Sequence, residues 1–369
     1  TSAYVGQAVA VAAALCKRQG VLPRALYKRG HMVQLQRELM KTGQHIPGLA
    51  LADDADLVAH ARLTASSTLA FSEFSRENLR WKSLDIGAAQ LVPVHAGAVP
   101  VFSLPVRASV NTALLVELRV SSRKGGFTPD TVLATESVAL APGITDLALD
   151  FGVVLEEKQY VFLTFLGNPE VQLPYTNQRI TGLLSVFNGV NKKVSNNGYQ
   201  QPPVGSGVDE FEFWCPQRRP EGQNIAIALA DRLLAFEPDN IRNGVDRPVT
   251  GPNAWVADPN DVDPYVLLQW DAPQTISRIV LVFDTDADHA MESVLMTHPE
   301  RVMPFCVRNY WIEDAAGKVI YRKTDNYQTR NTIVLDEPVT TDKLTIHVAH
   351  PSADVPAAVF AIRCYGGLQ

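Results

Sequence analysis

The sequence predicts a mainly β protein, in which a short N-terminal helical segment precedes two antiparallel β-sandwich domains of jelly-roll type. Three observations support this prediction. Apolar residues recur at helical spacing in about the first 60 residues. Beyond them the period changes to two, as in 114–120, where Leu114, Val116 and Leu118 share one face of a half-buried strand. Turn signals such as Pro142-Gly143 separate short runs of this kind, and such spacing is typical of sandwiches.

The domain organisation follows from these changes of pattern. We expect a helical remnant at 1–60, a first sandwich at 61–222 and a second sandwich at 223–369. A charged, proline-flanked stretch at 217–222 marks the second boundary. The predicted strands are 114–120, 131–140, 144–151, 160–166, 179–187 and 210–214, then 265–270, 276–283, 305–313, 318–323, 332–335, 343–348 and 357–365. Within the second sandwich only 225–234 shows a helical pattern.

The N-terminal segment contains two predicted helices. Residues 3–16 are apolar almost all round, which indicates a buried helix, and Lys17, Arg18 and Gly20 end it. A second helix at 31–42 ends at Gly43, and Asp53 or Asp54 can cap a further short helix ending near His60.

Composition excludes several classes of protein. A net charge of −6 argues against nucleic-acid binding, which needs a basic face. No run of about 18 apolar residues occurs, so no membrane span is expected. The four cysteines form no C-x-x-C pair, so neither a zinc finger nor a redox pair is predicted. Whether Cys306 pairs with Cys364 is left open.

The first 50 residues resemble a flavin-binding segment. The run 6–15, then Gly20 to Arg24, then 35–44 ending in Gly43-Gln44, resembles the last FAD-contacting segment of a family of bacterial FAD-dependent oxidoreductases. The resemblance implies that Gly6, Gln7, Ala8 and Ala10 contact FAD, since a helix N-terminus offers free N–H groups. Ala10 departs from the family, which has a second Gly there.

The Gly-rich βαβ unit that holds a dinucleotide is absent from the sequence. We therefore expect FAD only in a parent protein, with the rest of the flavin domain upstream, and no cofactor in this chain.

The last part of the chain resembles a galactose-binding-like (discoidin-type) domain. The residues that carry the resemblance are Asn243-Gly244, 253–256, 265–270 and 276–281, and it covers about residues 228–366. It implies a jelly roll whose members often bind sugars on loops at one end. Asn253 and Trp255 are the implied carbohydrate-binding candidates, although a core position for Trp255 is the favoured alternative.

Asp284, Asp286 and Asp288 alternate directly after a predicted strand. Carboxylates at such spacing can gather on a hard cation such as calcium. The EF-hand continuation is missing, because His289 and Leu295 occupy the Gly and Glu places. A solvated acidic loop is therefore favoured, and no metal is predicted.

Three functions remain at this point. The first is a C-terminal accessory portion of an FAD-dependent oxidoreductase, related to carbohydrate and not catalytic by itself. The second is a carbohydrate-binding or adhesive module. The third is a polysaccharide lyase or hydrolase, although the acids Glu136, Asp146, Asp150, Glu156 and Glu157 form no recognisable pair. Enzymatic activity and compartment are left open, with a periplasmic or secreted bacterial location as one interpretation.

Overall fold

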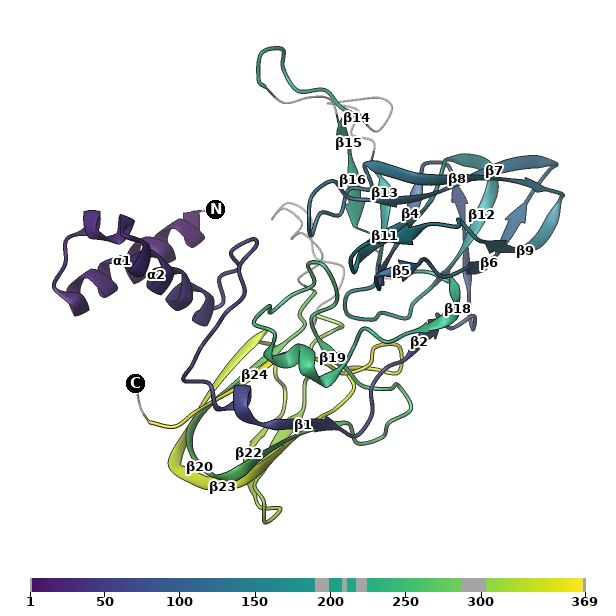
Figure 1. Cartoon of the computed structure of the whole chain (residues 1–369). Coiled ribbons are helices and arrows are strands. Elements are labelled where there is room, and N and C mark those ends of the chain that lie inside the picture. The colour runs from purple at the N-terminus through teal and green to yellow at the C-terminus, as the bar shows by residue number, and fades with distance from the viewer. Residues whose placement is uncertain (1, 190–198, 208–210, 217–223, 287–302, 368–369) are drawn as a thin grey trace.

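The computed structural model describes residues 2–189, 199–207, 211–216, 224–286 and 303–367. A pair of helices leads into two antiparallel β sandwiches (Figure 1). The predicted fold class, mainly β with an N-terminal helical segment, is confirmed. Among the described residues, no helix combines the length and the apolar character that crossing a membrane requires.

The helices form what we call the helical hairpin, residues 2–41. It consists of α1 (Ser2–Gln19), the 3₁₀ turn η1 (Pro23–Tyr27) and α2 (Arg29–Lys41). Leu15 and Cys16 of α1 pack with Leu26, and this small cluster is the core of the hairpin. The expectation that α1 is buried is wrong, because η1 and α2 cover only one of its sides. Tyr4, Val5 and Val9 are 58–62% exposed.

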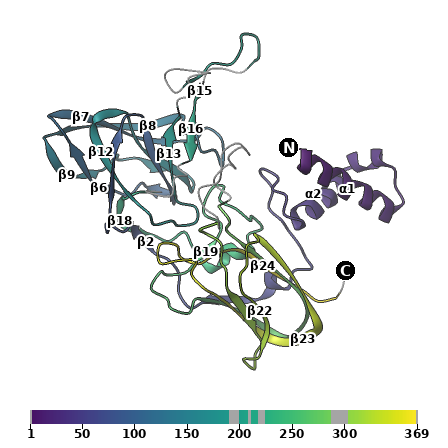
Figure 2. The ribbon, with the colours of Figure 1, turned by 180° about the vertical axis from the view of Figure 1, so that it is seen from behind.

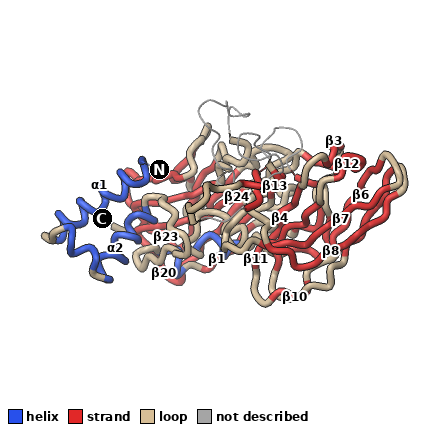
Figure 3. The backbone as a smooth tube through the Cα atoms, turned by 90° about the horizontal axis from the view of Figure 1, so that it is seen from above, coloured by secondary structure: helices blue, strands red, loops and turns tan. Residues whose placement is uncertain are grey.

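The first sandwich consists of two main sheets. The six-stranded sheet, in the order β16-β13-β4-β11-β7-β8, contains β4 (Ala88–Val94), β7 (Thr112–Val120), β8 (Thr131–Leu140), β11 (Gln159–Phe165), β13 (Leu184–Asn188) and β16 (Trp214–Pro216). The facing sheet, in the order β17-β12-β6-β18-β2 with β3 on β12 and β9 on β6, contains β2 (Phe71–Glu73), β3 (Arg80–Leu84), β6 (Phe102–Ala108), β9 (Gly143–Leu149), β12 (Asn168–Thr176), β17 (Asn224–Ile225) and β18 (Ala228–Leu233). Two short pairs complete it, β5 (Gly97–Ala98) with β10 (Val154–Leu155) and β14 (Tyr199–Gln200) with β15 (Phe211–Glu212). Figure 3 shows these strands gathered at the end of the molecule opposite to the helices.

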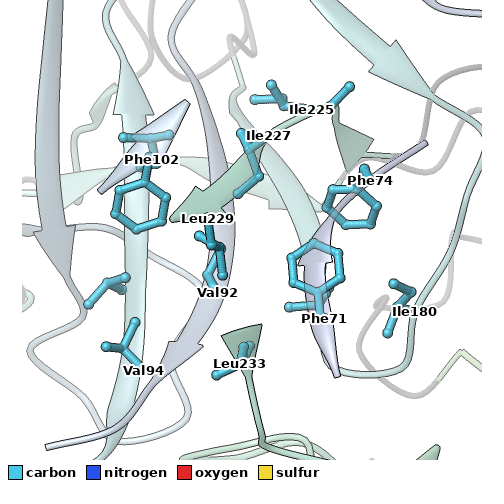
Figure 4. Close-up of a cluster of buried hydrophobic side chains, with 14 of the residues drawn as sticks. Phe71, Phe74, Val92, Val94, Phe102, Ile180, Ile225, Ile227, Leu229 and Leu233 are labelled. Carbon is cyan, nitrogen blue, oxygen red and sulfur yellow. The ribbon is translucent and has the colours of Figure 1, made fainter. Parts of the chain in front are cut away.

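The core of the first sandwich explains a wrong prediction. Ile225, Ile227 and Leu229 are buried between the sheets in the same cluster as Phe102 and Val92, and Figure 4 labels all five. Side chains at alternate positions lie on one face of an extended strand. The segment predicted as a helix at 225–234 is therefore extended and contributes β17 and β18.

The C-terminal sandwich is built around two strands of 19 residues each. Its sheet, in the order β19-β24-β20-β23-β21-β22 with β1 on β20, contains β1 (Arg62–Ala65), β19 (Trp255–Val256), β20 (Tyr265–Phe283), β21 (Tyr310–Glu313), β22 (Val319–Lys323), β23 (Arg330–Val348) and β24 (Ala358–Tyr365), with 3₁₀ turns η2 (Leu57–His60) and η3 (Pro238–Arg242). β20 joins two predicted strands, and its register against β23 shifts between Gln269 and Gln274. The shift bends the long strands around the core, in which Val266, Leu268 and Trp270 are buried at alternate positions.

Strand pairing crosses the expected domain boundary at residue 222 twice. β1, just past residue 60, pairs with β20, and β18, past residue 222, pairs with β6. The two sandwiches also share one hydrophobic cluster, in which Val280 and Phe360 of the C-terminal sandwich join Phe71 of the first. Figure 2 shows the two sandwiches side by side, with the helical hairpin next to the C-terminal one. The division into separate domains remains a prediction.

All four cysteines are free thiols, so Cys306 and Cys364 do not form the disulfide that was left open. Both are buried, and burial raises the pKa of the Cys306 thiol to about 11. The pKa of Cys364 is also raised by burial. Neither thiol is in the reactive thiolate form at neutral pH.

Candidate functional site

A cavity of about 520 Å³ lies between the end of the helical hairpin and the C-terminal sandwich. We call it the hairpin groove. Its helical side includes Tyr4, Thr42, Gly43, Gln44, His45 and Ile46. Its sandwich side includes Val245, Asp246, Arg247, Thr285, Thr329 and Arg330. The loop after η3 and the facing ends of β20 and β23 therefore supply one wall, and the hairpin with its linker supplies the other.

Asp246 fixes the charged side of the hairpin groove. Its Oδ2 accepts a hydrogen bond from Arg330 Nη2 at 2.8 Å, and its Oδ1 accepts one from Arg363 Nη2 at 2.5 Å. The side chain of Arg363 is only 6% exposed and that of Arg330 is 20% exposed. Burial lowers the pKa of Arg330, and the nearby carboxylate of Asp246 opposes this effect. One carboxylate therefore holds two guanidinium groups from β23 and β24 in place.

His45 contributes a neutral side chain from the helical side of the groove. Burial lowers its pKa first, the charge of Arg247 lowers it further, and Asp246 opposes both effects. The imidazole is therefore uncharged at neutral pH, so one ring nitrogen donates and the other accepts. Arg247 and Arg330 are matched in number by Asp246 and Asp286, and the groove lining has no net charge from these groups.

Hydroxyl, amide and apolar groups complete the lining. The hydroxyls of Thr285 and Thr329 are hydrogen-bonded to each other. Gln44 donates from Nε2 to Gln7 Oε1 at 2.9 Å and to the Tyr4 carbonyl at 3.1 Å. Tyr4 is 60% exposed and lines the groove together with the apolar Ile46. The groove thus presents both hydrogen-bonding groups and aromatic and aliphatic surface.

The flavin candidates lie along α1. Gly6 and Ala10 are exposed, and Gln7 and Ala8 are half-buried. Gln7 donates from Nε2 to Thr42 Oγ1 at 2.9 Å, and Gln44 bonds Gln7 in turn. The two segments that carry the flavin resemblance are therefore in contact. The cofactor prediction itself is untested.

The two carbohydrate candidates of the sequence lie outside the hairpin groove. Trp255 is fully buried in the core of the C-terminal sandwich, and its indole N–H donates to the Ser67 carbonyl at 2.9 Å. Its ring therefore has no exposed face on which a sugar could stack. Asn253 has a positive φ of 53°, accepts from Asn243 at 3.0 Å and donates to the Arg247 carbonyl at 2.9 Å. Asn253 braces the loop that carries Asp246 and Arg247.

Two of the three aspartates after β20 are described. Asp284 is buried, and its Oδ2 accepts from Thr181 Oγ1 at 2.7 Å, while Oδ1 accepts from the Asp286 N–H at 2.7 Å. Asp284 therefore links the two sandwiches. Asp286 lies at the hairpin groove, and Asp288 is outside the described residues. Within the described ranges, no group of three or more His, Cys, Asp or Glu is placed to hold a metal ion.

The first sandwich contains a carboxylate pair that sequence reasoning missed. Arg119 donates from Nε to Glu117 at 2.6 Å and from Nη1 to Glu212 at 2.9 Å. Trp214 Nε1 also donates to Glu212, at 2.6 Å. Both carboxylates accept hydrogen bonds from side chains of the same sandwich, which is typical of groups that stabilise a sheet. The acids singled out from the sequence are dispersed over exposed strand and loop positions: Glu136, Asp146, Asp150, Glu156 and Glu157.

Apart from Asp286, the groove residues were also missed, because they come from five separate segments of the chain. One local signal was available. The Asn243-Gly244 turn, in which Gly244 has a φ of 81°, begins the loop that carries Asp246. A Cβ on Gly244 would lie 2.4 Å from the Leu51 carbonyl oxygen, so this turn also holds the linker of the helical hairpin.

No protein-family model matches this sequence, and no curated protein sequence matches it. Some solved structures are similar to part of it. A family 32 carbohydrate-binding module from Streptococcus pneumoniae EndoD is 16% identical over 36% of this chain and 87% of that chain, with a TM-score of 0.28. A chitosan-binding module 1 from a chitosanase/glucanase of Paenibacillus sp. IK-5 is 14% identical over 36% of this chain and 88% of that chain, with a TM-score of 0.26. A Streptococcus pneumoniae fucose-binding module, SpX-3, is 11% identical over 31% and 74%, with a TM-score of 0.23. At these identities and TM-scores, no functional residue is carried over to this chain.

Proposed function

We propose that this chain binds a neutral carbohydrate in the hairpin groove. The observation that carries the proposal is the combination of fixed, charge-balanced polar groups with aromatic and aliphatic surface in one cavity. A sugar ring has the same two characters, since its hydroxyls need donors and acceptors while its C–H faces are apolar. Arg330, Asp246 and neutral His45 supply the hydrogen bonds, and Tyr4 and Ile46 supply the apolar contact.

Size and rigidity support the same function. The groove volume of about 520 Å³ falls within the range of small-ligand sites, roughly 300–1,000 Å³. Arg330 is held by Asp246 in the absence of any ligand, so binding does not have to order its guanidinium group.

Charge favours a neutral ligand over an anionic one. The arginines of the groove are matched by Asp246 and Asp286, and His45 is uncharged. A phosphorylated, sulfated or uronic-acid ligand would meet two carboxylates with no surplus of positive charge. A hydroxylated, uncharged ligand meets no such repulsion.

The test is an array of neutral, uronic-acid and sulfated glycans, followed by calorimetry on the Arg330→Gln variant. We expect the wild type to bind neutral glycans. The affinity of R330Q for them should be lower by a factor of about ten or more, because a charged hydrogen bond is lost. Arg322→Gln is the matched control. Arg322 is on β22, lies over the ring of Trp311 and is outside the groove. Equal affinities for R330Q and R322Q, or an array without neutral binders, would contradict the proposal.

We also propose that the chain is the accessory portion of a carbohydrate-related flavoprotein. The supporting observation is the Gln7–Thr42 hydrogen bond, which joins the two segments of the flavin resemblance. The predicted result is that this chain purifies colourless, while a longer protein containing it and an upstream flavin domain purifies yellow. A folded longer protein without flavin absorbance argues against it.

A further inference from the structure

We infer that docking of the helical hairpin onto the C-terminal sandwich, through Lys41 and Asp53, regulates the hairpin groove. This inference rests on the proposed function, because it concerns access to the same site. The hairpin and the linker that follows it form one wall of the groove, so the complete binding surface exists only while the hairpin is docked.

The docking contact is a small polar cluster. Lys41 Nζ, at the end of α2, lies 3.0 Å from Asp53 Oδ2. The Tyr365 hydroxyl on β24 donates to the same oxygen at 3.0 Å. Asp53 is therefore shared between the helical hairpin and the sandwich, and its side chain is only 6% exposed. Burial alone would raise its pKa, but the hydrogen bonds from Lys41 and Tyr365 outweigh burial and lower it.

Within the described ranges, the helical hairpin forms one ion pair with a residue outside itself, Lys41–Asp53. Its own core is the small cluster of Leu15, Cys16 and Leu26, and much of α1 is exposed. Directly after the hairpin, the chain also approaches the sandwich closely at Gly43, which has a φ of 94°. A Cβ at Gly43 would lie 3.2 Å from Arg330 Nε. Loss of the Lys41–Asp53 contact would therefore release the groove wall that includes Thr42, Gly43 and Gln44.

Lys41, Asp53 and Tyr365 are not among the residues that line the groove. Any effect of Asp53 on binding must therefore act through the position of the hairpin, which makes Asp53 a positioning residue. Because coupling between two equilibria is reciprocal, a ligand that touches both walls also stabilises the docked hairpin. Typical coupling changes affinity about five- to 150-fold.

The experiment compares Asp53→Asn with Asp54→Asn in the whole chain. Asp54 is the adjacent carboxylate and is exposed, so it controls for the loss of charge. Hydrogen exchange of residues 29–44 is measured first without sugar. Binding of three uncharged sugars, lactose, maltotriose and fully N-acetylated chitotriose, is then measured by calorimetry. We expect D53N to exchange faster in 29–44 and to bind about fivefold or more weakly, while D54N behaves like wild type.

Two results would overturn the inference: unchanged exchange in D53N, or faster exchange with unchanged affinity. Lys41→Met tests the same contact from the other side, so a folding defect peculiar to D53N does not decide the outcome. If wild type binds none of the three sugars, the proposed function fails. The exchange comparison uses no sugar and still supports or overturns the docking role of Asp53.

Discussion

The carboxylate of Asp56 accepts a hydrogen bond from the backbone N–H of Cys364 at 3.0 Å. The same oxygen accepts from the Val58 N–H at 3.0 Å and caps η2, so one side chain joins the linker to β24. Burial raises the pKa of Asp56 to about 6 despite these hydrogen bonds and the nearby Arg363. The ordinary value is 3.8. The folded state therefore binds a proton more tightly than the unfolded state.

This difference predicts that stability depends on pH. The contribution of protonated Asp56 to the free energy of unfolding is fully present below about pH 4 and is lost as the pH rises through about 6. The free energy of unfolding should fall by up to about 3 kcal/mol across this window. Asp56→Asn should remove this part of the pH dependence, since the amide oxygen can still accept both hydrogen bonds. Urea unfolding of the wild type and the variant between pH 4 and about 7.5 measures how the free energy of unfolding depends on pH. Asp54→Asn should keep the wild-type slope, and a D56N variant with that slope would disprove the assignment.

Trp255 should affect stability and leave sugar binding alone. Truncation by Trp255→Ala removes a fully buried ring and should cost about 3–5 kcal/mol. Trp255→Phe keeps most of the ring and loses the hydrogen bond to Ser67, so it should cost about 1–2 kcal/mol. Thermal unfolding and calorimetry on W255F separate the two effects. A folded W255F that no longer binds neutral glycans would make Trp255 a ligand contact.

Asp246→Asn should destabilise the fold as well as weaken binding. The change leaves Arg330 and Arg363 without their shared carboxylate, and Arg363 is almost fully buried. We expect a cost of about 2–3 kcal/mol, less than for a fully buried pair because Arg330 is partly exposed. Asp239→Asn is the control. Its pair with Arg242 has an exposed carboxylate, so its loss should cost less than about 1 kcal/mol. Equal urea midpoints for the two variants would contradict the role given to Asp246.

The buried thiols predict a labelling pattern. Iodoacetamide at neutral pH should leave Cys306 and Cys364 unmodified in the native protein, because burial raises the pKa of both. The partly exposed Cys215 should react. After unfolding in urea without reductant, all four cysteines should be labelled, as mass spectrometry can show. Labelling of Cys306 and Cys364 that requires a reductant would reveal a disulfide between them.

Local patterns alone were enough to predict much of the secondary structure. The alternation of apolar and polar residues predicted β8 at 131–140 with its observed bounds. It also predicted the two halves of β20 and of β23. Helical spacing followed by Gly43 predicted α2. These signals are readable because a strand or helix repeats its buried face every two or about 3.6 residues.

Other features were decided by the tertiary structure. The segment 225–234 has mixed patterns, and burial between two sheets makes it extended. The fully buried place of Trp255 depends on neighbours distant in sequence, including Ser67, which accepts from its indole N–H. The hairpin groove joins His45, Asp246 and Arg330, which no local pattern links. The sequence by itself determined the periodicity of the strands and helices, because that property is local. Only the tertiary structure decided which distant side chains meet, because that depends on long-range strand pairing and on the packing of the hairpin against the C-terminal sandwich.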